Sequence, residues 1–239
     1  MHDKVREVTE DEKVIAEMTE GGVLAALRWA ALSAYTRAWA DFDPDTGHSQ
    51  TVLGIIAHTL LADRQDRVFR LEKYASDDAA LLAGLLPSEQ ESLPNVDGVE
   101  RADLNGSPAW QFRQYRWFVS SFEHGRIHEI SWGRKSPTKR RIAAETGDSS
   151  PDQFVLPGMF DVPGNYALDP VTVRDLLAAR SPVISTVLTH SIDPQTGAIE
   201  LFLGRPRLNN DGGGSWLWLR PLLPRDGASV STEGRTAPT

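Results

Sequence analysis

The sequence predicts an α+β fold in which an N-terminal helical layer packs on a mostly antiparallel sheet of about six strands. Apolar residues recur at helical spacing through residues 20–86, whereas residues 97–222 alternate short apolar runs with turn residues. The first long helix is too apolar to stand alone in water, so both layers are expected to form one domain over 19–224. Residues 1–18 and 225–239 are polar and are expected to be flexible tails.

Three helices are expected in the helical layer. The first starts near residue 20 and ends before Pro44, because the residue that precedes a proline disfavours helical backbone. The second covers about 49–75, with Ser49 as its N-cap. A short third helix over 77–86 precedes a polar connection to the sheet.

The first two strands of the sheet are expected on either side of a tight turn. Residues 99–104 alternate as a strand does, and Asn105–Gly106 is the typical sequence of a type I′ hairpin turn. The next apolar run, 109–123, is about 15 residues long, whereas strands usually have about 5–6 residues. We therefore expect a bulge or a break near Gln114.

A second hairpin is expected after this run. His124–Gly125 has the composition of a tight turn, and residues 126–134 would form the returning strand. A two-residue turn would place Trp117 opposite Trp132, and aromatic pairs of this kind stabilise a sheet.

The rest of the chain is expected to complete the sheet. A connection rich in proline and glycine, residues 143–170, leads into a helix over 171–180. Strands are then predicted within 182–192, 198–208 and 215–223, separated by turn sequences.

The charge distribution is the strongest functional signal in the sequence. The whole chain has a formal net charge of −8. Residues 113–141 hold eight basic and only two acidic side chains, which gives this segment a net charge of +6. Such a basic patch focuses a local field that attracts anions.

The leading hypothesis is a non-enzymatic module that binds an anionic partner, with nucleic acid as the first candidate. Aromatic rings of the hairpin would stack on bases, and the candidates are Tyr115, Trp117 and Trp132. Basic side chains would neutralise phosphates, and the candidates are Arg113, Arg116, Arg126, Arg134, Lys135, Lys139, Arg140 and Arg141. Two observations oppose this interpretation, because alternating tryptophans are also typical of a core and the chain as a whole is acidic.

Two other classes of function remain open, so the sequence leaves undecided whether the protein is an enzyme. A hydrolase-like enzyme, acting on a small molecule or on nucleic acid, would have its pocket between the sheet and the helices. Its acid–base residues would come from His128, Glu129 and Glu200. A protein–protein or homo-oligomeric domain would use an exposed edge strand that carries Trp216 and Trp218.

Two weaker motifs were weighed and set aside. His124 and His128 have a spacing that suits a metal on a helix, but a hairpin would separate them, so neither a metal site nor a cofactor is predicted. Residues 47–50, Gly-His-Ser-Gln, resemble the start of the nucleophile elbow of α/β-hydrolases. Thr51 stands where that motif has its second glycine.

Composition limits the cellular setting. The chain has no cysteine, which excludes disulfides and thiolate chemistry. No apolar run is long enough for a transmembrane helix, and the first residues lack the apolar core of a secretory signal, so we expect a cytoplasmic protein with no membrane partner. Arginine outnumbers lysine by 20 to 5, which suggests a GC-rich bacterial genome.

Overall fold

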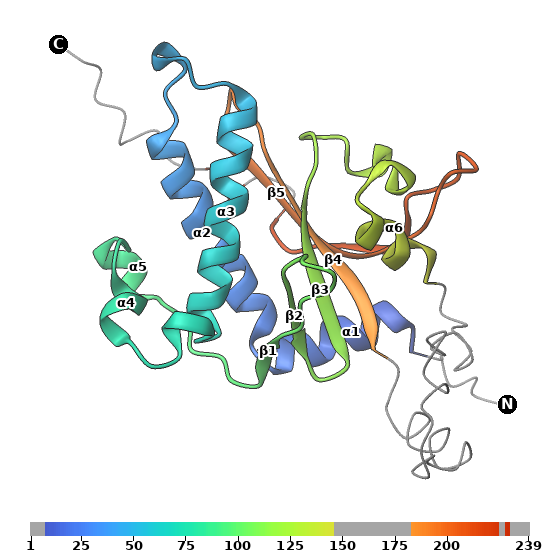
Figure 1. Cartoon of the computed structure of the whole chain (residues 1–239), viewed down its shortest axis with the longest axis horizontal. Helices are drawn as coiled ribbons and strands as arrows, with labels where there is room; N and C mark the ends of the chain where they lie inside the picture. The colour runs from blue at the N-terminus through green and yellow to red at the C-terminus, as the bar shows by residue number, and fades with distance from the viewer. Residues whose placement is uncertain (1–7, 146–182, 225–227, 230–239) are drawn as a thin grey trace, which may run out of the picture.

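The predicted fold class is confirmed by the computed structural model, which describes residues 8–145, 183–224 and 228–229 (Figure 1). Helices from the N-terminal part of the chain cover one face of a mixed, mostly antiparallel sheet. The expected helix over 171–180 and most of the expected tail over 225–239 lie outside the described residues. Within the described residues, no helix combines the length and the apolar character that crossing a membrane would need.

The helical layer is built around two long antiparallel helices that are joined by a short turn. The α-helices are α1 (Glu10–Glu20), α2 (Val23–Asp41), α3 (Gln50–Val68), α4 (Asp78–Leu82) and α5 (Pro87–Glu91). The short 3₁₀ helices η1 (Pro44–Thr46) and η2 (Glu72–Tyr74) follow α2 and α3. As expected, Ser49 caps α3, because its side chain accepts a hydrogen bond from the backbone N–H of Val52.

Helix α1 corrects the expectation of a flexible tail for residues 10–18, whereas residues 1–7 lie outside the described residues. The carboxylate of Glu12 accepts a hydrogen bond from the backbone N–H of Thr9, which satisfies a donor at the helix start. Val14 and Met18 are fully buried in the main core. The segment is mostly polar, so its composition did not predict a helix, but its buried apolar side chains lie on one stripe of that helix.

The sheet has the strand order β1-β2-β3-β4-β5-β6, and β7 pairs with β5. Neighbours are antiparallel except for β3 and β4, which run parallel. The predicted break near Gln114 is confirmed, because the long apolar run divides into two strands there. The strands are β1 (Val99–Arg101), β2 (Ala109–Phe112), β3 (Tyr115–Ser121), β4 (Ile184–Ile192), β5 (Ala198–Pro206), β6 (Trp216–Pro221) and β7 (Ala228–Ser229).

The expected second hairpin is wrong. After β3 the chain forms η3 (Ile127–Glu129), η4 (Trp132–Arg134) and α6 (Pro137–Ala144) instead of a returning strand. The reason is long-range hydrogen bonding: Asn209 binds the backbone of Ile130 and Trp132, and Ser215 also donates to the carbonyl of Ile130. The free edge of β3 is taken by β4.

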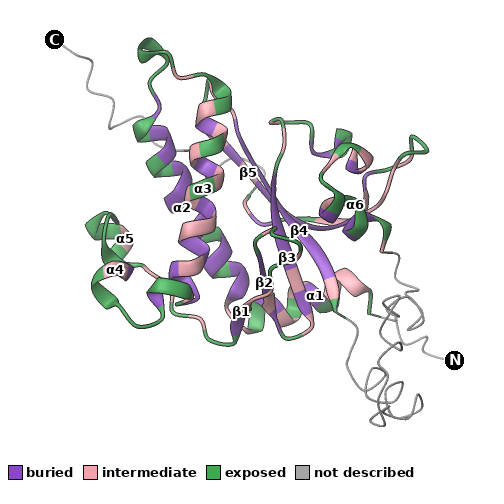
Figure 2. Cartoon of the chain, viewed as in Figure 1, coloured by how far each residue is buried: buried purple, intermediate pink, exposed green. Residues whose placement is uncertain are grey.

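Most residues of the central strands β3 and β4 are buried (Figure 2), as expected for strands that are covered on both faces. Helices α2 and α3 cover one face and form the largest core with Trp110, Trp117, Leu188 and Leu203. On the other face, Ala143 of α6 packs with Trp132 and its neighbours. The sheet is therefore sandwiched along the part of β3 and β4 that α6 reaches.

Candidate functional site

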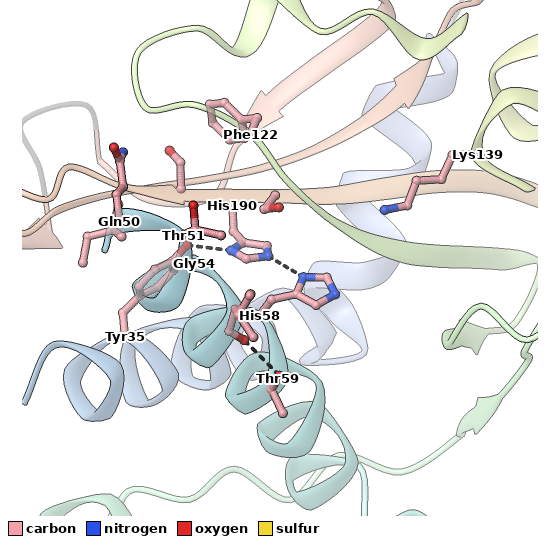
Figure 3. A pocket seen from close by; sticks show the side chains of 13 residues that line it. Tyr35, Gln50, Thr51, Gly54, His58, Thr59, Phe122, Lys139 and His190 are labelled. Carbon is pink, nitrogen blue, oxygen red and sulfur yellow. Dashed lines mark hydrogen bonds between the residues drawn. The ribbon is translucent and has the colours of Figure 1, made fainter. Parts of the chain in front are cut away.

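A pocket of about 500 Å³ lies at the carboxyl ends of β3 and β4 (Figure 3). Its walls come from α2, α3, the ends of these two strands, and α6. Strand β3 ends at Ser121, whereas β4 continues to Ile192, so no strand of the described residues pairs with the end of β4 on that side. Lys139 of α6 reaches the pocket beside this unpaired end.

A chain of three hydrogen-bonded side chains ends in this pocket. Tyr35 on α2 and His190 on β4 are each only 1% exposed, and the Tyr35 hydroxyl lies 2.6 Å from Nδ1 of His190. Nε2 of His190 lies 3.0 Å from Nδ1 of His58 on α3. His58 is partly buried and contributes to the pocket wall.

The direction of the hydrogen bonds in this chain follows from the Tyr35 hydroxyl. A phenol O–H needs an acceptor, and His190 is the hydrogen-bond partner that the structure gives it among the described residues. Tyr35 therefore donates to Nδ1 of His190, Nε2 of His190 donates to Nδ1 of His58, and Nε2 of His58 carries a proton. Figure 3 shows this last nitrogen directed away from His190, so the chain presents an N–H donor.

Burial keeps all three groups uncharged at neutral pH. Burial raises the pKa of Tyr35 well above its usual value. The pKa of His190 is lowered to about 3 by burial, and further by repulsion from a protonated His58 and from Lys139. Burial and the charge of Lys139 also lower the pKa of His58. Two neutral imidazoles therefore face a cationic side chain.

Lys139 is that cation. It is partly buried, and burial together with the charge of Lys135 lowers its pKa to about 8. Among the described residues, no carboxylate forms an ion pair with Lys139. Lys135 is also partly buried, and its ammonium lies 3.5 Å from the backbone oxygen of Ser121. The pocket is therefore locally positive although the chain is acidic.

A second polar cluster lies next to the pocket and contains Glu200. Its Oε2 accepts hydrogen bonds from Ser191 at 3.0 Å and from the backbone N–H of Gly125 at 2.9 Å. Nδ1 of His124 lies 3.3 Å from the Ser191 hydroxyl and 3.4 Å from Glu200. A catalytic triad uses the two imidazole nitrogens for two different partners. Here one nitrogen faces both partners, so this cluster does not have triad geometry.

The three residues expected to stack on bases are in the core, which corrects that expectation. Tyr115 is 2% exposed, and Trp117 and Trp132 are fully buried. Their polar atoms donate within the protein, to Glu17, Gln65 and the backbone oxygen of Ser215 respectively. None of these rings presents an open face on which a base could stack.

The eight basic residues do not converge on one surface. Arg113 pairs with Glu17, Arg116 donates to Ser185, and Arg126 pairs with two glutamates. Lys139 lines the pocket, whereas Lys135 lies outside the pocket wall, with its ammonium near the backbone oxygen of Ser121. The exposed residues among the remainder are Arg134, Arg140 and Arg141.

The acid–base candidates from the sequence lie outside the pocket wall. His128 is exposed, and Glu129 pairs with Arg126. Among the described residues, no three histidine, aspartate or glutamate side chains gather as metal ligands would. No pattern in the sequence predicts that Tyr35, His58 and His190 form one hydrogen-bonded unit.

A signal for His190 was present in its strand. Leu188, His190 and Ile192 alternate along β4, so His190 had to face the same core as its apolar neighbours. A buried histidine needs partners for both ring nitrogens. The partners themselves could not be found from the sequence.

Comparisons with known proteins give no further assignment. A scan against protein-family models, a search of curated proteins and a search of solved structures each found no match. The geometry of the pocket therefore carries the functional argument.

Proposed function

We propose that this protein binds a small anionic molecule, bearing a carboxylate or a phosphate, in the pocket between α3, β4 and α6. The observation that carries the proposal is the partly buried ammonium of Lys139, which has no ion pair among the described residues and lies near the N–H donor of His58. The ligand's anionic group would supply the missing counter-charge.

The energetics favour such a ligand. Burying a cation without a partner costs free energy, and an opposite charge offsets that cost. Electrostatic attraction is also stronger in a partly desolvated site than in bulk water. A bound anion is therefore attracted both by Lys139 and by the fixed dipole of the Tyr35–His190–His58 chain.

The size and lining of the pocket favour a small molecule. Pockets for drug-sized ligands have volumes of about 300–1,000 Å³, and this pocket has about 500 Å³. Apolar wall is provided by Ile55, Phe122 and Ile192. The ligand is therefore expected to combine an anionic group with a compact apolar part.

Fewer residues support the two other hypotheses, binding of nucleic acid and homo-oligomerisation. Binding of nucleic acid would rest on the exposed Arg134, Arg140 and Arg141, without aromatic stacking. Homo-oligomerisation through β6 would use a strand at the edge of the sheet. The indoles of Trp216 and Trp218 on that strand already donate to Ile127 and Glu10 of the same chain.

Calorimetric titration with inorganic phosphate, with acetate and with a short oligonucleotide tests the proposal. Lys139→Gln is expected to weaken phosphate or acetate binding by at least about tenfold, the effect of losing a charge-assisted contact. The matched control Arg140→Gln removes an exposed charge one residue away and should leave the affinity within about twofold.

Three results would overturn the proposal. One is the absence of phosphate and acetate binding, and another is an equal loss of affinity in both variants. The third is binding of the oligonucleotide alone, which would favour the nucleic-acid alternative. The pH dependence gives an independent check, because affinity should fall as the pH rises through about 8, where Lys139 loses its charge.

A further inference from the structure

We propose that Lys139 is a nucleophilic amine that forms an imine with a carbonyl compound in this pocket, so that the ligand class is a small aldehyde or ketone with an anionic group. This inference rests on the proposed anion site, and it adds a covalent step. Carbonyl compounds react with lysine amines that are desolvated or that lie near another cation.

The backbone holds Lys139 in a fixed position. Helix α6 starts at the N-cap Ser136, whose side chain accepts a hydrogen bond from the backbone N–H of Lys139. The next turn is anchored by Ile142 and Ala143, which are buried against the sheet. The side chain of Lys139 is therefore directed from a packed helix, not from a loop.

The amine points toward the histidine pair. Figure 3 shows the Lys139 side chain extending into the pocket toward His58 and His190, on the opposite side from α2. A carbonyl group in the space between them would meet the amine on one side and the N–H of His58 on the other. That donor would stabilise negative charge that develops on the carbonyl oxygen.

The groups around Lys139 favour its uncharged form. His58 comes from α3, His190 from β4, and Lys135 from the segment before α6, and none of these is an anion. Glu200 on β5 is occupied by hydrogen bonds from Ser191 and Gly125. With a pKa of about 8, about half of the Lys139 amines are free at pH 8. An exposed lysine has a pKa of about 10.4 and is almost fully protonated there.

The proposed step balances without a further reactant. The nitrogen of Lys139 forms a bond to the carbonyl carbon while the C–O π bond breaks, and one of the two amine protons passes to the oxygen, which gives a carbinolamine. The C–O bond then breaks, and the hydroxyl group leaves with the second amine proton as one molecule of water. The product is a C=N double bond to Lys139, and hydrolysis by water reverses the reaction.

Reductive trapping on the whole chain tests the proposal. Glyoxylate is an aldehyde with a carboxylate, and borohydride reduces its imine to a stable carboxymethyl group on the lysine. The chain has five lysines, so peptide mapping by mass spectrometry assigns each site. We expect labelling at Lys139 to exceed that at Lys13, Lys73 and Lys135 by at least about tenfold near pH 8, because these three amines lie outside the pocket wall.

Two variants and one competitor distinguish the reactivity of the Lys139 amine from the effect of its positive charge. Lys139→Arg keeps the positive charge, so it should abolish labelling but retain phosphate binding. Lys13→Arg makes the same replacement on an exposed lysine and should change neither. Phosphate should slow the labelling of Lys139, and neutral propanal should label it less selectively than glyoxylate.

The outcomes distinguish this inference from the proposed function. Uniform labelling of the five lysines overturns the imine proposal. If Lys139→Gln loses phosphate binding but glyoxylate does not label the native chain selectively, the anion site stands and the imine does not. Selective labelling without phosphate binding would remove the anion site and leave a reactive lysine.

Discussion

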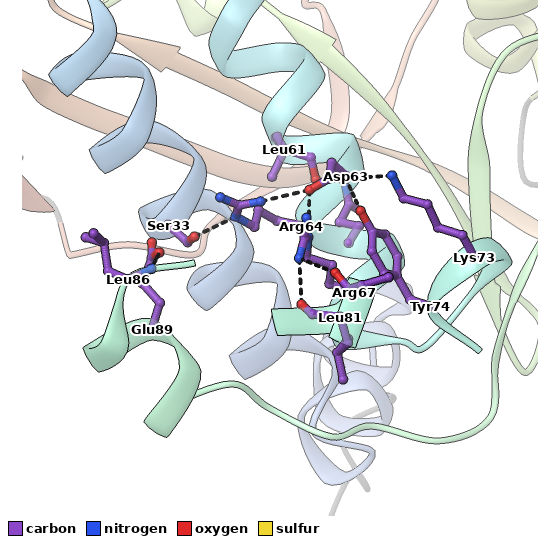
Figure 4. Close-up of polar contacts among 12 residues, drawn as sticks. Ser33, Leu61, Asp63, Arg64, Arg67, Lys73, Tyr74, Leu81, Leu86 and Glu89 are labelled. Atoms are coloured by element: carbon purple, nitrogen blue, oxygen red, sulfur yellow. Dashed lines mark hydrogen bonds and ion pairs between the residues drawn. The ribbon is translucent and has the colours of Figure 1, made fainter. Parts of the chain in front are cut away.

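Two buried polar clusters lie on the same helix, α3, and differ in how their charges are balanced. Near its middle, His58 continues a neutral chain that faces the unpaired Lys139 (Figure 3). About one turn later, the carboxylate of Asp63 accepts hydrogen bonds from Arg64 and Arg67, each at 2.8 Å, and from the Tyr74 hydroxyl (Figure 4). Among the described residues, no carboxylate pairs with the cation of the first cluster, whereas the second cluster is built around a carboxylate.

The cluster around Asp63 has a structural role. Arg67 also donates to the backbone oxygens of Ala80 and Leu81, which holds the segment after α3 against the helix. Burial opposes the ionisation of Asp63, but the hydrogen bonds from Tyr74 and Arg67 and the charges of Arg67 and Arg64 outweigh it and lower its pKa. The buried guanidinium groups of this cluster are therefore already paired with a carboxylate, whereas the ammonium of Lys139 in the pocket would gain its counter-charge from a ligand.

The largest expected effect comes from removing the shared carboxylate. Asp63→Ala leaves Arg64 and Arg67, both buried, without an anion, and breaking a buried pair costs about 3–5 kcal/mol of unfolding free energy. Denaturation with urea measures this loss. In the matched control Asp78→Ala, a side chain that is 90% exposed loses its pair with Arg70, and the cost should stay below about 1 kcal/mol. Equal losses in the two variants would contradict the expected difference between the buried ion pairs of Asp63 and the exposed ion pair of Asp78.

A smaller loss is expected from Tyr35→Phe. Nδ1 of the buried His190 would lose its hydrogen-bond partner, at a cost of about 2 kcal/mol in unfolding free energy. The tautomers of His190 and His58 would no longer be fixed, which nitrogen-15 NMR of the imidazoles detects. An unchanged pair of tautomers, with a cost under about 0.5 kcal/mol, would show that Tyr35 does not orient the chain.

The two clusters are also expected to differ in the pH range over which they affect the unfolding free energy. The pKa of His190 is about 3 in the folded protein, whereas an unfolded histidine has a pKa of about 6.5. The unfolded state therefore binds one more proton between these values, so stability is complete above about pH 6.5 and falls as the pH drops toward 3, by about 1.4 kcal/mol per pH unit.

Urea denaturation between about pH 7 and about pH 5 measures this slope, and His190→Gln should reduce it. The pKa of Asp63 is lowered, so its contribution is lost only at lower pH, below about 4. An equal slope in the variant and the native protein would mean that His190 is not the titrating group.

The smallest expected effect has the opposite sign. Lys139→Met replaces an unbalanced, partly buried cation by an apolar side chain of similar length, and we expect a gain of up to about 1 kcal/mol in unfolding free energy. The same variant should lose anion binding. A loss of stability comparable to that of Asp63→Ala would show that Lys139 has a structural counter-charge after all.

Local pattern was sufficient for most of the fold. Helical spacing located α2 and α3, although α3 ends at Val68, earlier than expected, and is followed by Arg70 with a positive φ of 50°. The excess length of the apolar run over 109–123 predicted its division near Gln114. These features depend on residues that are neighbours in the sequence, so a pattern records them.

The segment after β3 shows where local pattern fails. His124–Gly125 has turn composition, and the aromatic residues that follow have strand propensity. The segment instead pairs its backbone with Asn209 and Ser215, which lie far along the chain. The local sequence does not predict that this segment avoids a strand. The outcome depends on which distant side chains form hydrogen bonds with its backbone.

The sequence by itself determined the two long helices of the helical layer, most strands of the sheet, and a positive charge within residues 113–141 of an acidic chain. Only the tertiary structure decided what that charge does. In the folded protein the tryptophans are buried in the core and several of the arginines form ion pairs. Lys139 of α6 lies beside His58 of α3 and His190 of β4. The physical reason is that burial and the absence of a counter-charge are properties of the assembled surroundings, which no residue carries alone.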